Sequence, residues 1–234
     1  MLGTKNEWET KDWLHSARKL VEWASETQTD SRIMLLVRHS HREEIEDHSA
    51  QLSTELTPLG ILMSTEMGRR LPAGRKTHIF FSFVSRCYQT AEEIGNGIVE
   101  KGGRIDEMDY LPVLSSPMVN DDRFWNGLQP DGKNITDFVN NWGQGVYGEY
   151  VEPFDAYGMR LLNDTIERLR GAAPGTMHIH ITHDLALMAA KRILLGRAVG
   201  SQDREPFLGG IGIIITGNQT QMYNAGSVHD LDSI

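Results

Sequence analysis

The feature that most constrains the fold is a short run of consecutive apolar residues, Ile33-Met34-Leu35-Leu36-Val37. Such a run is compatible with a β-strand and is apolar on both faces, as a strand buried within a parallel sheet must be. Two further short segments, residues 77–81 and 177–182, are also predicted strands. Segments with helical periodicity separate the three, which indicates an α/β protein.

Apolar residues at helical spacing predict the elements between and after these strands. The predicted helices are residues 57–71, 86–99, 134–142, 154–169 and 184–195, and Pro58 occupies the first position of the first of them. Residues 209–216 and 220–223 are predicted to form a closing hairpin. Together these elements predict a three-layer α/β sandwich with a mostly parallel central sheet.

The chain divides into an N-terminal helical extension, residues 1–30, and a single α/β domain, residues 31–234. A length of 234 residues supports one sizeable core. Residues 105–152 are the least regular part of the domain and are predicted to form a lid or insertion. The aromatic side chains between residues 124 and 157 fit either a lid over a substrate or ordinary core, and the sequence leaves both open.

Charge and composition exclude several classes of function. The chain has 23 Lys and Arg against 32 Asp and Glu, a net charge of −9, which argues against a nucleic-acid-binding protein. No stretch approaches 18 consecutive apolar residues, so we expect no membrane partner. The single cysteine excludes an internal disulfide framework, and we expect a cytoplasmic location. The sequence does not define the oligomeric state.

Charged and imidazole side chains follow all three predicted strands. They are Arg38, His39 and Arg42 after the first strand, Arg86 after the second, and His183 and Asp184 after the third. Ligands of open α/β sheets bind at the carboxyl ends of the strands, so we expect these side chains to converge there. Arginine presents a rigid fork of donors that matches phosphate oxygens. The cluster therefore predicts a site for a small phosphorylated substrate.

A histidine inside such a cluster can act as a nucleophile. Neighbouring guanidinium charges lower the pKa of an imidazole, which keeps it neutral near pH 7. Attack on phosphorus would give a phosphohistidine, while the arginines stabilise the charge on the phosphoryl oxygens. A carboxylic acid would protonate the leaving alcohol, and its carboxylate would then activate water.

Four sequence blocks resemble the histidine phosphatase superfamily, which includes the phosphoglycerate-mutase-like enzymes and the histidine acid phosphatases. The blocks are Val37 to Arg42, Leu56 to Gly60, Ser82 to Ala91 and Thr182 to Asp184. The resemblance implies that His39 is the phosphorylated nucleophile. It also implies that the phosphate is held by Arg38, Arg42, Arg86 and His183, without a metal ion or other cofactor.

The sequence departs from the family pattern at two points. Ser40 stands where the family usually has glycine. The proton donor is less defined. The acid-phosphatase branch uses the Asp after the second histidine, here Asp184. The mutase-like branch uses a Glu that this sequence lacks, and Asp121 and Asp122, the carboxylates near the expected place, are the alternative acids. We favour Asp184 as the acid and a hydrolytic reaction. A mutase using the same site, or an inactive module that binds phosphorylated ligands, are the alternatives.

The remaining histidines and the cysteine have simpler interpretations. His178 and His180 could be metal ligands, but we interpret them as buried, hydrogen-bonded histidines, because Met177, Ile179 and Ile181 on the other face are apolar. His41 is interpreted as an exposed loop residue, and Cys87 as a packing residue rather than a reactive thiol.

Overall fold

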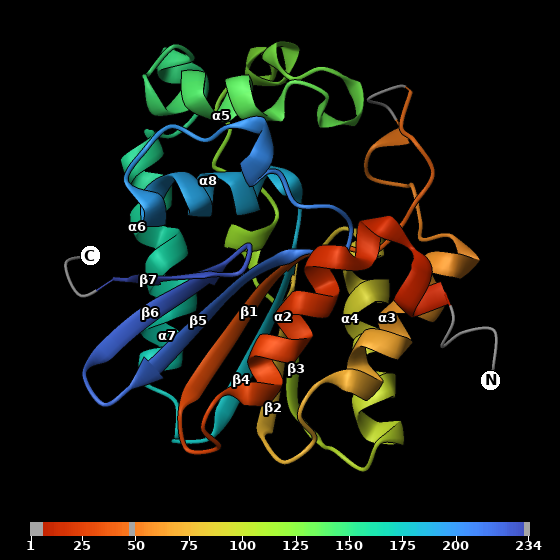
Figure 1. Cartoon of the computed structure of the whole chain (residues 1–234). Coiled ribbons are helices and arrows are strands. Elements are labelled where there is room, and N and C mark those ends of the chain that lie inside the picture. Colours follow the sequence, from red (N-terminus) through yellow and green to blue (C-terminus); the bar gives the residue numbers. More distant parts are fainter. Residues whose placement is uncertain (1–6, 47–49, 232–234) are drawn as a thin grey trace.

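The computed structural model describes residues 7–46 and 50–231. Within them, seven strands form one sheet in the order β3-β2-β4-β1-β5-β6-β7 (Figure 1). The pairings from β3 to β1 are parallel, and those from β1 to β7 are antiparallel. The predicted α/β fold with its mostly parallel sheet is confirmed, with an antiparallel addition at one side. The strands are β1 (Arg32–Arg38), β2 (Lys76–Phe81), β3 (Ile105–Tyr110), β4 (Thr176–Thr182), β5 (Gly210–Thr216), β6 (Gln219–Asn224) and β7 (Ser227–Asp230).

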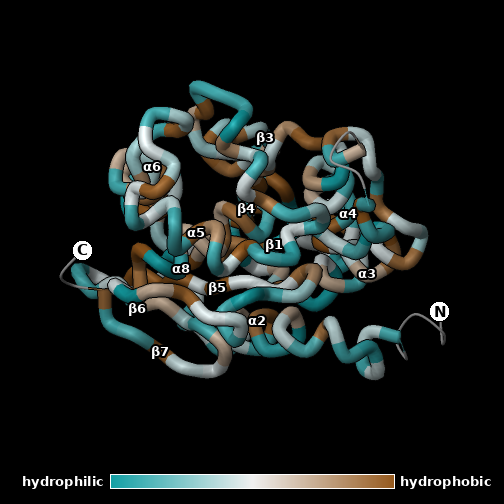
Figure 2. The backbone as a smooth tube through the Cα atoms, turned by 90° about the horizontal axis from the view of Figure 1, so that it is seen from above, coloured by the Kyte–Doolittle hydropathy of each residue, from teal (hydrophilic) through white to brown (hydrophobic). Residues whose placement is uncertain are grey.

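Helices cover both faces of the sheet, which lies between them when the molecule is seen from above (Figure 2). One face carries α2 (His15–Glu26), α3 (Pro58–Arg70) and α4 (Ser85–Glu100). The other carries α5 (Ile135–Gly143), α6 (Phe154–Leu162), α7 (Arg168–Arg170) and α8 (Asp184–Leu195), with a π-helical turn, Asn163–Glu167, between α6 and α7. Short 3-10 helices are Asp12–Leu14, Pro112–Leu114, Asp122–Gly127, Pro130–Gly132, Gly148–Tyr150 and Ser201–Asp203. No helix of the described ranges is long and apolar enough to cross a membrane.

The strand β1 is buried on both faces, as its unbroken apolar run predicts. Ile33, Leu35 and Val37 pack into the cluster formed with α2, α3 and α4. Met34 and Leu36 pack into the cluster on the opposite face. Because successive side chains of a strand alternate between faces, only a strand covered on both sides needs apolar residues at every position.

The predicted N-terminal helix packs on the sheet. Leu14, Ala17, Leu20 and Ala24 recur at helical spacing and are each buried in the same cluster as the inner residues of β1. Residues 1–6 of the predicted extension lie outside the described residues. From Leu14 onward, this segment therefore contributes to one of the two helical layers.

Strand β3 was not predicted, and neither was β7. Residues 105–110, assigned to the irregular segment, instead pair in parallel with β2 at the edge of the sheet. The sequence Ile-Asp-Glu-Met-Asp-Tyr is acidic and almost entirely exposed, so it lacks the apolar pattern of a buried strand. Charged residues are common on edge strands because they prevent pairing with another chain. The irregular part therefore begins after Tyr110.

Candidate active site

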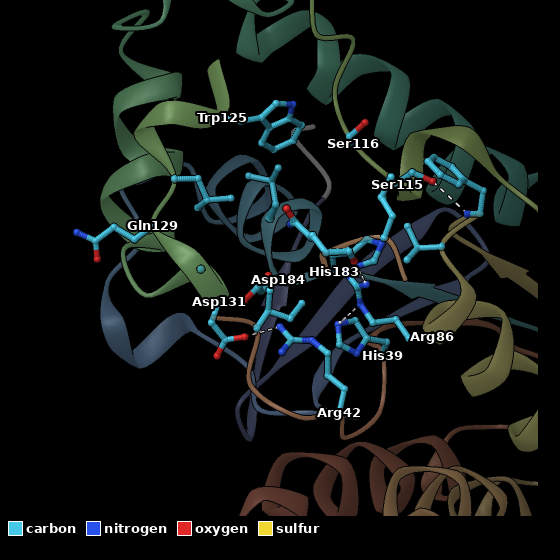
Figure 3. Close-up of a pocket in the computed structure, with 18 of the residues that line it drawn as sticks. His39, Arg42, Arg86, Ser115, Ser116, Trp125, Gln129, Asp131, His183 and Asp184 are labelled. Atoms are coloured by element: carbon cyan, nitrogen blue, oxygen red, sulfur yellow. Dashed lines mark hydrogen bonds and ion pairs between the residues drawn. The ribbon is translucent and has the colours of Figure 1, made fainter. Parts of the chain in front are cut away.

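The register of the sheet brings the two site histidines together. Arg38 of β1 lies opposite Thr182 of β4, so the next residues, His39 and His183, leave the sheet side by side. The backbone N–H of His39 donates to the carbonyl of Thr182 at 2.9 Å, and the two imidazole rings lie 5.4 Å apart. The N–H of Ser82 donates to the carbonyl of Ile181 at 3.0 Å, which brings in the segment after β2. The predicted convergence of His39, Arg86 and His183 is therefore seen in the structure (Figure 3).

The loop after β1 is held in place by two of the other sequence blocks. Ser40 donates through its N–H to the Thr90 hydroxyl at 3.0 Å, and through its own hydroxyl to the carbonyl of Gly60 at 2.8 Å. The N–H of Thr57 donates to the carbonyl of His41 at 3.0 Å. A side chain at Gly60 would place Cβ 2.2 Å from that same carbonyl oxygen, so glycine permits this close approach. Ser40, the departure from the family pattern, is accommodated by its hydrogen bond to α3.

His39 is presented as a neutral imidazole with a defined tautomer. Its Nδ1 lies 2.9 Å from the carbonyl oxygen of Ser40, and its Nε2 accepts a hydrogen bond from Arg86 Nε at 3.1 Å. Because a carbonyl only accepts, Nδ1 carries the proton and Nε2 carries the lone pair. Burial lowers the pKa of His39 well below its usual range, and the charge of Arg86 lowers it further.

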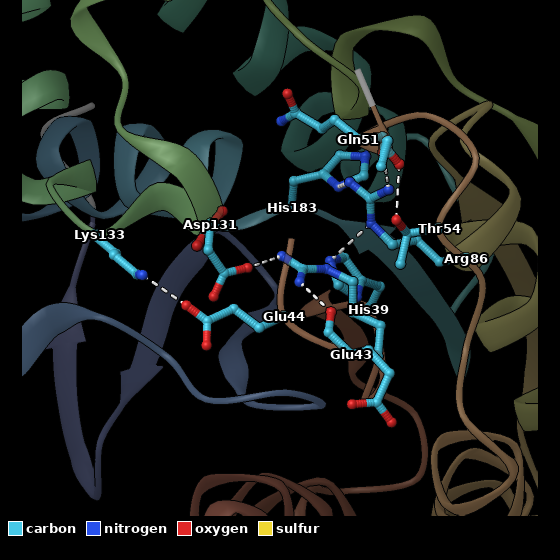
Figure 4. A network of polar contacts seen from close by, with 12 residues as sticks. His39, Glu43, Glu44, Gln51, Thr54, Arg86, Asp131, Lys133 and His183 are labelled. Atoms are coloured by element: carbon cyan, nitrogen blue, oxygen red, sulfur yellow. Dashed lines mark hydrogen bonds and ion pairs between the residues drawn. The ribbon is translucent and has the colours of Figure 1, made fainter. Parts of the chain in front are cut away.

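His183 is held between a hydroxyl and a guanidinium group. Its Nε2 lies 2.8 Å from the Ser82 hydroxyl, and its Nδ1 lies 3.2 Å from a terminal nitrogen of Arg86. Burial, with the nearby Arg86, lowers the pKa of His183 to about 3. Arg86 also donates to the carbonyl of Gln51 at 2.5 Å, so it links both imidazoles to the loop that follows β1 (Figure 4).

Two of the three predicted arginines are paired with carboxylates. Arg38 lies 3.2 Å from Asp184, and Arg42 lies 2.6 Å from Asp131. Arg38 does not line the pocket, whereas Arg42 and Arg86 do. Among the described residues, the Nε atoms of Arg38 and Arg42 are buried without a hydrogen-bond partner. Buried donors without acceptors are costly, so this cluster favours an additional anion.

Asp184, the favoured proton donor, lines the pocket and lies between two guanidinium groups. Besides Arg38, Arg204 contacts the same carboxylate oxygen at 3.0 Å. Burial by itself would raise the pKa of Asp184, but the charges of Arg38 and Arg204 outweigh it, so the pKa lies below its ordinary value. Without substrate, Asp184 is therefore a carboxylate.

The two alternative acids have different positions. Asp121 caps a short helix and pairs with Arg123 at 2.6 Å, which lowers the pKa of the carboxyl to about 2, and it does not line the pocket. Asp122 does line the pocket and forms no ion pair with another described residue. Of the two alternatives, only Asp122 faces the pocket.

Sequence reasoning missed three residues of the cluster: Asp131, Arg204 and Phe207. The carbonyl of Asp131 accepts from Arg204 at 3.1 Å, while its carboxylate pairs with Arg42. The Phe207 ring lies 4.5 Å from the guanidinium carbon of Arg38 and 5.7 Å from the His39 ring, so it supports both. These residues come from irregular segments and a single 3-10 turn, without a motif. For Asp131, the only signal was that arginines placed together need neighbouring carboxylates.

The excess charge of the cluster matches a phosphate monoester. Four guanidinium groups, those of Arg38, Arg42, Arg86 and Arg204, face the two carboxylates of Asp131 and Asp184. Two positive charges remain unbalanced within the cluster, although the whole chain has a net charge of −9. A phosphate monoester dianion would balance them.

His178 and His180 lie in the core rather than in a metal site. His178 and His180 are buried as predicted, but the prediction that they are hydrogen-bonded was wrong, because none of their ring nitrogens has a partner among the described residues. They pack among aromatic rings, and the His178 ring meets the ring of Phe80 edge-on at a centroid distance of 5.4 Å. No group of three His, Cys, Asp or Glu side chains in the described ranges is arranged to hold a metal ion.

Cys87 and His41 are both packed. Burial raises the pKa of the Cys87 thiol to about 12, which supports its interpretation as a packing residue. His41 is half-buried rather than exposed, because its ring lies 5.5 Å from Trp13 and 5.3 Å from Phe207.

Comparisons with known proteins identify the family and support the fold. Residues 34–210 match the family model described as the histidine phosphatase superfamily (branch 1). The structure is similar to that of YhfR from Bacillus stearothermophilus, with a TM-score of 0.55, 19% identity, and coverage of 84% of this chain and 98% of YhfR. It is also similar to the alpha-ribazole phosphatase of Shigella flexneri, with a TM-score of 0.53, 18% identity, and coverage of 83% and 96%. At these identities the likeness shows the fold alone. No curated protein matches the sequence.

Proposed function

Because this chain belongs to the histidine phosphatase superfamily, we propose that it hydrolyses a phosphate monoester through a phosphohistidine on His39. The observation that carries the proposal is the tautomer of His39. Ser40 accepts from Nδ1, so Nε2 presents its lone pair to Arg86 in the pocket. A histidine nucleophile needs this neutral form, and the lowered pKa supports it.

When the substrate binds, its phosphoryl oxygens accept hydrogen bonds from guanidinium groups that otherwise pair with residues of the cluster. Arg42 and Arg86 line the pocket and turn N–H groups to the phosphoryl oxygens, and Arg38, which lies behind the lining, adds its positive charge. His183 donates from Nδ1 once its tautomer changes. The Ser82 hydroxyl permits this change, because it can either accept from Nε2 or donate to it.

The reaction then proceeds in two displacements. The lone pair of His39 Nε2 attacks phosphorus, a P–N bond forms, and the P–O bond to the alcohol breaks. The guanidinium groups stabilise the negative charge on the phosphoryl oxygens. Water next attacks the phosphohistidine and the P–N bond breaks. Inorganic phosphate is released, and His39 returns to its neutral form.

Asp184 is proposed to move the protons of both steps. In the absence of substrate it is held as a carboxylate by Arg38 and Arg204. A phosphate dianion in the pocket attracts the charge of Arg38 away from Asp184 and adds negative charge nearby, and both effects raise the pKa of Asp184. The acid form protonates the leaving alcohol, and the carboxylate accepts a proton from the attacking water. No metal ion takes part in this scheme.

Phosphate release from a panel of phosphate monoesters, measured with and without EDTA, tests the proposal. We expect turnover that EDTA does not lower, and acid-labile phosphate on the protein after quenching. His39→Ala should abolish turnover, and retention of more than about 10% of the rate refutes nucleophilic catalysis. His229→Gln, on the edge strand β7 and outside the pocket lining, is the control.

The same assay separates the alternatives. A mutase would transfer the phosphoryl group to an added alcohol rather than to water. An inactive binding module would bind inorganic phosphate but release none from any ester.

A further inference from the structure

Beyond the arginine cluster, the pocket is wide and has largely apolar walls. Its volume is about 600 Å³, which is in the range of sites that hold a drug-sized organic molecule and far exceeds the needs of a phosphoryl group. The walls come from the loop after β1, the segment after β2 and the segment between β3 and α5. They include Leu52, Phe83, Val84, Trp125 and Leu128.

Two of these apolar side chains are exposed to the pocket and to solvent. Leu52 is 63% exposed and Phe83 is 61% exposed, and both lie at the pocket. The backbone of Phe83 is held by a hydrogen bond from its N–H to the Ser115 hydroxyl at 3.2 Å. Large apolar side chains held at a pocket, rather than folded into the core, are typical of contact with an apolar ligand.

The indole of Trp125 provides a flat wall above the cluster (Figure 3). Its ring lies 4.8 Å from that of Phe124, which is fully buried in the core. Trp125 is therefore supported from behind while it lines the pocket. A supported aromatic face loses little side-chain freedom when it stacks on a ligand ring.

The charges of the described pocket residues disfavour a second anionic group. Among the described residues of the pocket lining, the cationic ones are Arg42 and Arg86, and both belong to the cluster that balances the phosphoryl group. Lys133 does not line the pocket and is paired with Glu44 at 2.6 Å (Figure 4). Asp122 faces the pocket without an ion-pair partner in the described part of the chain. A carboxylate or second phosphate in this region would lack a cation and would meet Asp122.

Resting on the proposed phosphatase activity, we propose that the substrate is a phosphate monoester of an uncharged alcohol with an aromatic body. The phosphoryl group binds the arginine cluster, and the aromatic body packs between Trp125 and Phe83. Bisphosphates and phosphorylated carboxylic acids are excluded by charge. These two aromatic residues and Asp122 therefore determine specificity.

A matched series of esters tests this inference: propyl phosphate, 3-phenylpropyl phosphate and 3-carboxypropyl phosphate. All three have a primary alkyl leaving group, so the demand for protonation is the same. We expect kcat/KM for the phenylpropyl ester to exceed that for the propyl ester by at least about tenfold, and the carboxypropyl ester to be the poorest. Equal values for the phenylpropyl and propyl esters would overturn the inference without affecting the proposed hydrolysis.

Single substitutions test whether side chains of the pocket wall cause the preference for the phenylpropyl ester. Trp125→Ala and Phe83→Ala should each lower the phenylpropyl-to-propyl ratio by about fivefold. Asp122→Asn should raise the carboxypropyl-to-propyl ratio, and any role of Asp122 in proton transfer cancels in that ratio. Met159→Ala, an equally exposed apolar residue on α6 outside this pocket, is the control and should leave both ratios unchanged. Ratios that no wall variant changes would contradict the assignment.

Binding of phosphonates separates this inference from the proposed function. 4-Phenylbutylphosphonate and butylphosphonate have the shapes of the two esters but cannot be hydrolysed. Calorimetry should show tighter binding of the phenyl compound by at least about tenfold, whether or not the protein turns over esters. Equal affinities refute the substrate class. Tight phenyl binding without hydrolysis of any ester would instead refute the phosphatase activity.

Discussion

Lowering the pH from 7 to 5 should destabilise the protein, because histidines are buried in it as neutral imidazoles. His178 on β4 is the best case, since it lies in the core opposite the face that carries α2, α3 and α4. Its ring nitrogens have no hydrogen-bond partner among the described residues, and its ring stacks 5.2 Å from that of His78. Burial, with the charges of His78 and Arg168, lowers the pKa of His178 to about 3.

The direction of the effect follows from proton binding. In the unfolded chain the imidazole has its ordinary pKa of about 6.5, so it binds a proton at pH 5, whereas in the folded state it does not. The unfolded state therefore binds more protons, and the free energy of unfolding falls as the pH drops below about 6.5. Between pH 7 and pH 5, His178 alone should cost about 2 kcal/mol of stability.

Urea unfolding of the protein and of His178→Leu, at pH 7 and at pH 5, measures this cost. The loss of stability between the two pH values should be smaller in the variant by about 2 kcal/mol. The comparison uses the change in the free energy of unfolding between pH 7 and pH 5. The effect of leucine on packing is nearly the same at both pH values, so it largely cancels. His15→Gln, at an exposed position of α2, is the control for the removal of any histidine. A variant with the same pH difference as the wild type would refute the reasoning.

Three further predictions concern the site. Asp184→Asn should slow the hydrolysis of alkyl phosphates far more than that of aryl phosphates, because aryl leaving groups need less protonation; equal slowing would assign the acid elsewhere. Arg204→Gln removes a charge that lowers the pKa of Asp184, so the basic limb of the pH profile of kcat should move to higher pH. If Arg204 had a purely structural role, kcat would fall but the basic limb would not move. Gly60→Ala forces Cβ against the carbonyl of His41 and should cost about 1–3 kcal/mol in urea unfolding, with a loss of activity. Gly74→Ala, whose Cβ would meet nothing within 4 Å, should cost far less, and equal costs would show that the contact is unimportant.

Much of the framework could be predicted from local patterns. The predicted helix 184–195 coincides with α8, and the predicted strand 177–182 lies within β4, because apolar periodicity is a property of the segment itself. The strand β3 escaped prediction because an edge strand has no buried face to impose a pattern. The prediction that His178 is hydrogen-bonded was also wrong. The hydrogen-bond partners of a buried side chain depend on which residues pack against that face of the sheet, and a local pattern does not contain this information.

The sequence by itself determined the layered α/β architecture and the convergence of His39, Arg86 and His183. Parallel strands end at a common edge, so residues that directly follow them must meet. Only the tertiary structure decided the charge balance, because Asp131 and Arg204 reach Arg42 and Asp184 from connecting segments whose paths depend on the packing of the whole chain. The same packing brought Trp125 and Phe83 to the pocket wall, since side chains distant in sequence come together only when the loops between them are placed.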